Sequence, residues 1–237
     1  MRGLLEVIAL HAADAERAEA GGADRIELVG TMESDGLSPT PQAVEKVRRS
    51  TTIQLRAMVR LRDGFRTDGG EATRLKGLID AYFDAGADGV VLGFLDGHAS
   101  IDREVMGELL AEGQWPWTFH RALDYCLDRE RAWAALLELP RLDQVLTAGS
   151  VRGVEHGLDD LVARAKADKE VARLTMAGGS LNAEHVPWLV RSGVSAFHLG
   201  RGVRPGGSYK AYVDEALVGS WRRLVDDTLR HAREVTS

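Results

Sequence analysis

Charged residues stand where buried strands would be expected to be apolar. Glu6 and Glu27 each interrupt a short apolar run near the start of the chain, and Arg56 and Arg60 interrupt a third run. Isolated charges are rarely buried without a partner. Charges of both signs in successive strands therefore indicate a shared, enclosed polar site.

Proton transfer is the chemistry that these residue types suit best. His120 could act as a general acid or base, with Asp124 orienting its ring. Glu6 or Glu27 would supply a second proton-transfer group, because carboxylates and histidines can be tuned to titrate near neutral pH. The candidate catalytic residues are therefore Glu6, Glu27, His120 and Asp124.

Arginines and glycine turns predict an anion site beside these groups. Arg60 and Arg121 could bind a negatively charged substrate, and Arg201 stands between two glycines. Glycine turns after the last two strands of a barrel often bind phosphate through backbone N–H groups, although glycine is also the ordinary residue of tight turns. Thr147 and His198 stand at the ends of expected strands. The candidate substrate-binding residues are Arg60, Arg121, Thr147, Gly178, Gly179, His198, Arg201 and Gly202.

A structural interpretation of the same charges stays open. Glu6 and Glu27 could simply neutralise Arg56 and Arg60 in a polar interior, because removing one partner of a buried ion pair leaves the other uncompensated. His120 could be an ordinary hydrogen-bonded residue. Perturbed charges cluster at functional sites without being confined to them, so residue type alone does not decide between the two interpretations.

A repeated joint indicates which elements must position these residues. The segments 20–24, 84–88 and 191–195 each carry a glycine and lead at once into an apolar run. A helix that ends at a glycine in the left-handed conformation, followed by a buried strand, has this pattern. Such joints are typical of repeated strand–helix units around a parallel sheet.

The chain divides into eight candidate strands separated by helical stretches. Each unit takes roughly 30 residues, close to the usual size in a (β/α)8 barrel. We therefore expect an α/β fold in which residues 1–237 form one single-domain TIM-like barrel. An open doubly wound sheet is the main alternative, and it would lack pairing between the first and eighth strands. The expected strands lie near 4–10, 25–29, 53–60, 88–93, 116–120, 143–147, 172–177 and 195–200.

Alternation within the third strand predicts a polar barrel interior. Arg56, Met58 and Arg60 share one face, whereas Leu55 and Ala57 lie on the other. The apolar face should meet the surrounding helices, which leaves the charged face pointing inward. Active residues of such barrels collect at the carboxyl ends of the strands.

The helix boundaries follow from capping residues. Asp14, Thr40 and Asp128 are expected to cap the helices that follow them. Pro41 suits the first turn of its helix. The last helix is expected over residues 211–235, with a bend or break at Gly219-Ser220.

Composition excludes several classes of function. The net charge of −6, from 30 Lys and Arg against 36 Asp and Glu, gives no support for nucleic-acid binding. No run approaches the roughly 20 apolar residues that span a bilayer, and the first strand is too short for a secretory signal. Cys126 is the single cysteine, which excludes an internal disulfide and favours a cytoplasmic location. The five lysines fall outside the expected strands, which argues against a Schiff-base mechanism.

A set of motifs in order along most of the chain resembles the CutC copper-homeostasis family. The most specific of them is Thr-Phe-His-Arg-Ala-Leu-Asp at residues 118–124. The resemblance implies a TIM-type barrel, a cytoplasmic location, homo-oligomerisation and a role in copper tolerance. The motifs occupy residues 5–7, 21–28, 36–40, 58–62, 85–93, 118–124, 145–149, 178–179 and 197–198.

The chain departs from this family where copper is concerned. Family members commonly carry a cysteine two residues after each of the two glutamates, and here those positions are Ile8 and Val29. Cu(I) prefers thiolate and thioether ligands. Cys126, Met58 and Met176 remain as candidate soft donors. Two hypotheses follow. The protein is either a copper-handling protein with copper as its ligand, or an enzyme that performs acid–base chemistry on a small anionic or phosphorylated molecule.

Overall fold

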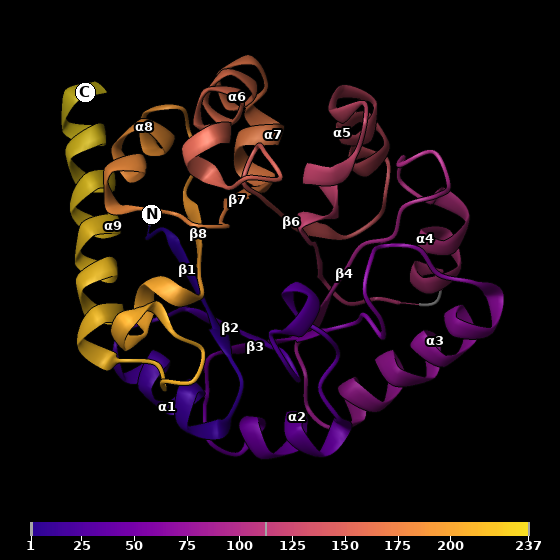
Figure 1. Cartoon of the computed structure of the whole chain (residues 1–237). Helices are drawn as coiled ribbons and strands as arrows, with labels where there is room; N and C mark the ends of the chain where they lie inside the picture. The colour runs from indigo at the N-terminus through magenta and orange to yellow at the C-terminus, as the bar shows by residue number, and fades with distance from the viewer. Residues whose placement is uncertain (1, 112, 237) are drawn as a thin grey trace.

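Eight parallel strands close into a barrel in the computed structural model, which describes residues 2–111 and 113–236. Each strand pairs with the next along the chain, and helices surround them (Figure 1). The strands are β1 (Leu4–Ala9), β2 (Arg25–Leu28), β3 (Gln54–Met58), β4 (Gly89–Leu92), β5 (Trp117–Phe119), β6 (Leu142–Thr147), β7 (Thr175–Ala177) and β8 (Ala196–Leu199).

The first and last strands pair directly, which confirms the barrel. Leu4 lies opposite Ala196, and Glu6 lies opposite His198. An open doubly wound sheet would leave these two strands apart, so that alternative was wrong.

Helices form the outer ring of the molecule (Figure 1). None of the helices within the described residues has the length and apolar content needed to cross a membrane. The helices are α1 (Ala12–Ala20), α2 (Pro41–Arg48), α3 (Gly69–Asp84), α4 (Arg103–Leu110), α5 (Arg129–Leu137), α6 (Val154–Ala167), α7 (Lys169–Leu174), α8 (Val186–Arg191) and α9 (Glu215–Thr236).

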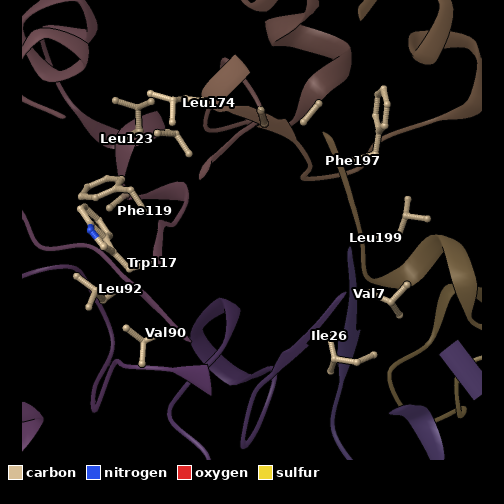
Figure 2. Close-up of a cluster of buried hydrophobic side chains, with 14 of the residues drawn as sticks. Val7, Ile26, Val90, Leu92, Trp117, Phe119, Leu123, Leu174, Phe197 and Leu199 are labelled. Atoms are coloured by element: carbon tan, nitrogen blue, oxygen red, sulfur yellow. The ribbon is translucent and has the colours of Figure 1, made fainter. Parts of the chain in front are cut away.

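The main hydrophobic core lies between the strands and this ring of helices. Side chains such as Val7, Ile26 and Phe197 are fully buried and encircle the barrel (Figure 2). On β3, Met58 lies on the face that points away from this core, and it belongs to a separate cluster with Ile8. The alternation predicted for β3 is therefore confirmed. The residues that line the barrel interior are different from those that form the main core.

Two of the three predicted helix caps are confirmed. The Thr40 hydroxyl accepts a hydrogen bond from the N–H of Ala43 at 3.2 Å, and Asp128 accepts one from Arg131 at 3.0 Å. The prediction for Asp14 was wrong, because α1 begins after His11. The Asp14 carboxylate is buried and forms an ion pair with Arg204 at 3.0 Å instead.

Two element boundaries also differ from the prediction. Strand β7 is shorter, because the preceding helix α7 continues to Leu174. Helix α9 begins only at Glu215, where the Asp214 carboxylate accepts a hydrogen bond from the N–H of Leu217. The break expected at Gly219-Ser220 is absent from this described helix, and the Ser220 hydroxyl donates to the Ala216 carbonyl within it.

Candidate active site

A cavity of about 300 Å³ opens at the carboxyl ends of the strands, and we call it the mouth cavity. Its walls come from β1, β2, β3, β6 and β8 and from the loops that follow β2, β3, β5, β7 and β8. Five predicted residues are not in its lining: Glu6, Asp124, Cys126, Thr147 and Gly178. The predicted residues that do line it are Glu27, Arg60, His120, Arg121, Gly179, His198, Arg201 and Gly202.

Strand register places a histidine between two glutamates at the base of the cavity. Glu6 on β1 lies opposite His198 on β8, and Glu27 extends from the neighbouring strand β2. The Nδ1 atom of His198 lies 2.7 Å from a carboxylate oxygen of Glu6, and its Nε2 atom lies 3.5 Å from Oε2 of Glu27. All three side chains are buried. Oε1 of Glu27 has no hydrogen-bond partner among the described residues.

The two glutamates differ in protonation because their neighbours differ. Burial alone would raise the pKa of Glu6, but Arg25 and His198 outweigh burial and lower this pKa to about 2. Burial raises the pKa of Glu27 to about 7. The attraction of His198 lowers this pKa, but by less than burial raises it. Although burial disfavours its charged form, Glu27 and Glu6 together raise the pKa of His198. At neutral pH Glu6 is therefore ionised while Glu27 is poised to titrate.

Glu6 is held by an arginine that sequence reasoning missed. Arg25 lies opposite Glu6 in the β1–β2 register, and its Nε atom lies 2.5 Å from the Glu6 carboxylate. Arg25 and Arg56 also share Asp143, at 2.8 and 2.7 Å. The expected pairing of Glu6 and Glu27 with Arg56 and Arg60 was wrong in detail. Arg25 could have been found, because it has the same strand parity as Glu27.

His120 faces the mouth cavity as a hydrogen-bond donor. Its Nδ1 atom accepts the N–H of Ala122 at 3.2 Å, which assigns the ring hydrogen of the neutral form to Nε2. Burial, and then the nearby Arg60, lower the pKa of His120 to about 3. Nε2 is buried and has no partner among the described residues. His120 is therefore neutral at pH 7 and presents an unsatisfied N–H group.

Asp124 does not orient His120, contrary to the prediction. Its carboxylate accepts hydrogen bonds from Arg121 at 2.8 Å and from the Thr147 hydroxyl at 2.6 Å. It also accepts the N–H of Ala148. These contacts fasten the loop after β5 to the end of β6, so Asp124 and Thr147 support the cavity wall from behind.

Arg60 fastens two loops that cover the cavity. Its guanidinium donates to the carbonyl of Gly64 at 2.9 Å, and to the carbonyls of Ser34 and Gly36 across the cavity rim. It also lies over the ring of Phe65, with its central carbon 4.7 Å from the ring centroid. Any ligand would compete with these protein groups for Arg60, so its predicted role as a substrate ligand stays untested.

Arg201 is the cation that is better placed to receive a ligand. Within the part of the chain that the structure describes, its side chain makes no hydrogen bond or ion pair, and its guanidinium lies 5.5 Å from the ring centroid of Tyr209. Tyr209 also lines the cavity. Sequence reasoning missed Tyr209, because nothing in the segment after β8 shows that its ring turns back over the barrel.

Several glycines leave room for the polar side chains. A Cβ atom on Gly93 would lie 2.9 Å from the His120 ring, and one on Gly178 would lie 2.9 Å from Cβ of His198. Gly179, at a φ of +92°, lies against the guanidinium of Arg121. Close packing thus accounts for Gly178 and Gly179, and their predicted role in phosphate binding stays a prediction.

The barrel interior has apolar side chains at the two positions where thiolate ligands for Cu(I) would be expected. The positions where thiolates would be expected are Ile8 and Val29, which pack in an apolar cluster with Met58. Cys126 is buried, and burial raises the pKa of its thiol to about 11. Of the described residues, the buried group that could gather around a cation is Glu6, Glu27 and His198, but Arg25 and His198 already occupy Glu6.

Comparison with known proteins identifies the family. The family model described as CutC family matches residues 4–203. The chain is 34% identical over 204 residues to a CutC family protein of Xanthomonas axonopodis pv. citri (strain 306), and the match covers 84% of each chain. It is 32% identical over 201 residues to one of Enterobacter sp. (strain 638), covering 84% of this chain and 80% of the relative.

Solved structures agree with this match. A candidate copper homeostasis protein CutC from Streptococcus agalactiae superposes with a TM-score of 0.74 at 25% identity, covering 84% of this chain and 98% of that one. A thiamine phosphate pyrophosphorylase from Pyrococcus furiosus, 17% identical over 95% of this chain and 96% of its own, shares the fold with a TM-score of 0.60. The extent and the identity of these matches show that the chain belongs to the CutC family.

Proposed function

We propose that this protein is an enzyme that carries out acid–base chemistry on a small anionic molecule in the mouth cavity. The observation that carries the proposal is Glu27. Its carboxyl group is buried, lines the cavity and has an oxygen without a partner among the described residues. A carboxylate that served only the fold would be expected to have its oxygens paired.

The state of Glu27 suits proton transfer. A general acid or base works best when its pKa lies near the working pH, and the pKa of Glu27 is raised to about 7. Glu6 keeps a pKa of about 2 in the same network. When the environments of two neighbouring carboxyl groups give them different pKa values, the two groups typically take different roles in acid–base catalysis. Here Glu6 fixes His198, and His198 in turn contacts Glu27.

Size and charge support a small anionic ligand. A cavity of about 300 Å³ lies at the lower end of the usual range for small-molecule sites. Arg121 and Arg201 line it together with Arg60. The acidic side chains in the same lining are Glu27 and Asp35. Three arginines therefore exceed two carboxyl groups, and the excess of positive charge is larger when Glu27 is protonated.

The test is a thermal-shift screen of small carboxylates and phosphate esters, followed by activity assays on the compounds that stabilise the protein. We expect Glu27→Gln to retain ligand binding but to lower kcat by about 100-fold or more. Glu45→Gln is the control, because Glu45 is an exposed residue of α2 and forms a surface ion pair with Arg49, just after that helix. Full activity of Glu27→Gln would contradict the proposal.

Copper handling is a second candidate function. The observation that favours it is that the thioethers of Met32 and Met58 both line the mouth cavity, and thioethers are ligands for Cu(I). Titration with Cu(I) against a competing chelator would test it, with Met58→Leu and Cys126→Ala as variants. Tight binding that either variant abolishes would favour copper over the enzymatic proposal.

A further inference from the structure

We infer that the reaction in the mouth cavity is the removal of a proton from a carbon atom next to a carbonyl group. The substrate class is a small carbonyl compound that carries one anionic group. Glu27 would take the proton, and His120 would hold the carbonyl oxygen. The inference rests on the acid–base function proposed above and deepens it.

The His120 ring can donate a hydrogen bond to a ligand, but it cannot accept one. Its Nδ1 atom is occupied by the N–H of Ala122, so the ring has no free lone pair with which to act as a base. The ring is wedged between Gly93 and Phe65, with its centroid 5.2 Å from that of Phe65. The unpaired Nε2–H therefore has a fixed direction, and it requires an acceptor from a ligand. A carbonyl oxygen is such an acceptor.

The environment of His120 favours an oxygen that gains negative charge. Arg60 lies close enough to His120 to lower its pKa, so the positive charge that disfavours a protonated ring would attract an enolate. Arg201 lies at the same rim without an anionic partner among the described residues. Donors that are fixed before the reaction stabilise developing charge without reorganisation.

Glu27 supplies the complementary group. Its unpaired oxygen accepts when it is ionised, whereas the unpaired atom of His120 can only donate. Glu27 and His120 both line the cavity, and their unpaired atoms differ in hydrogen-bonding character. A carbonyl group bound to His120 would present its neighbouring C–H bonds to the rest of the cavity, where Glu27 is the carboxylate among the barrel strands.

The step balances without any further reagent. The Glu27 carboxylate takes a proton from the carbon next to the carbonyl group, and the C–H bonding electrons form a C=C bond. The electrons of the C=O double bond move to oxygen, and this enolate oxygen accepts the Nε2–H of His120. If the protonated Glu27 exchanges its hydrogen with water before a proton returns to the same carbon, hydrogen from the solvent is incorporated into the compound.

The experiment is to follow deuterium incorporation from D₂O by NMR, using the wild-type protein and two matched pairs of compounds. Pyruvate and dihydroxyacetone phosphate carry the carbonyl group with a carboxylate or a phosphate. Lactate and glycerol 3-phosphate carry an alcohol in its place. Every other carbonyl acid that stabilises the protein in the thermal-shift screen is included, and the spontaneous exchange rate is subtracted.

We expect enzyme-dependent exchange with at least one carbonyl compound that binds, and none with the alcohols. Glu27→Gln should lower the exchange rate by about 100-fold or more, and His120→Phe by about 100-fold. His120→Gln should recover part of the rate, because its amide retains an N–H donor. The control Glu45→Gln should exchange at the wild-type rate.

The outcomes separate this inference from the function on which it rests. If anions bind and Glu27-dependent turnover is found but no bound carbonyl compound exchanges, the carbonyl inference is overturned and the acid–base proposal stands. Exchange that is unchanged in His120→Phe would overturn the role of His120. If no anion binds at all, both the function and the inference are overturned.

Discussion

Glu6 and Glu27 show how two residues of one type acquire different chemistry. In the strand register Glu6 stands between Arg25 on one side and His198 on the other. Glu27 stands opposite Ile8 on one side and opposite Arg56, which pairs with Asp143, on the other. Glu6 is therefore stabilised as an anion, while burial raises the pKa of Glu27 to about 7, so that both its neutral and its ionised forms are populated at pH 7.

Removing the charge of Glu6 should destabilise the fold. Glu6→Gln leaves Arg25 and His198 without their shared anion, and breaking a buried pair costs about 3–5 kcal/mol. Because the folded pKa of Glu6 lies below its ordinary value of 4.5, this stabilisation is fully present above pH 4.5 and is lost as the pH falls towards 2. Urea unfolding of wild type and Glu6→Gln at pH 7 and at pH 3 measures the difference.

The control for this prediction is Glu45→Gln, whose side chain is half exposed. A surface pair contributes about 0–1 kcal/mol, so the control should unfold almost like wild type. A difference between wild type and Glu6→Gln that is small at pH 7, or that grows as the pH falls to 3, would contradict the account.

Residue type and parity predicted part of this site. Glu6, Glu27 and His198 were found because charges stand out in apolar strands, and the structure brings them into contact. The partner of Glu6 could not be assigned, because several arginines had suitable parity and only the register of β1 against β2 selects Arg25. The pairing of His120 with Asp124 failed because the chain turns between them and sends Asp124 towards Thr147.

At the scale of elements, the loops after β2 and β3 depend on one side chain. Arg60 bonds to carbonyls of both loops, and Phe65 packs between Arg60 and His120. Phe65 stands in the segment that follows β3, and its side chain belongs to the cavity wall.

Arg60→Met should loosen both loops. The substitution removes the donor from the carbonyls of Ser34, Gly36 and Gly64. The Gly36 carbonyl is buried, and leaving such a group unpaired costs about 1–3 kcal/mol. We expect faster amide hydrogen exchange at residues 33–37 and 62–67, measured by mass spectrometry. Arg62→Met is the matched control, since Arg62 is half exposed and bonds to Asp68 and Glu71 only. Equal exchange in the two variants would show that Arg60 does not hold the loops.

Close packing of α6 on the barrel depends on a glycine. A Cβ atom on Gly157 would lie 2.0 Å from the Ala148 carbonyl oxygen, whereas one on Gly77 in α3 would meet nothing within 4 Å. Gly157→Ala should lower the free energy of unfolding by about 1–3 kcal/mol through overpacking. Gly77→Ala should raise it by about 0.5–1 kcal/mol. Urea unfolding distinguishes them, and a stable Gly157→Ala variant would contradict this contact.

The order of elements was predictable because each unit repeats the same joint between helix and strand. The helix cap that failed, Asp14, is determined instead by contacts between distant segments. The sequence around Asp14 is suitable for a helix cap. Its carboxylate instead forms an ion pair with Arg204 and accepts a hydrogen bond from the N–H of Val213, both far along the chain. No local pattern contains such a pairing.

At the scale of the whole molecule, closure of the barrel creates the site. Pairing of β1 with β8 brings His198 against Glu6, although 192 positions separate them in the chain. The hydrophobic core outside the barrel (Figure 2) carries the packing, which frees the interior for charged groups. Homo-oligomerisation, which the family resemblance implied, stays a prediction.

The central claim is that Glu27 exchanges its proton near neutral pH inside the mouth cavity. A carbon-13 NMR titration of protein labelled at glutamate tests it directly, with the Glu27 resonance assigned by its absence in Glu27→Gln. Our account predicts an inflection at about pH 7 for Glu27 and none above pH 3 for Glu6. An inflection for Glu27 at or below its ordinary value of 4.5 would contradict it.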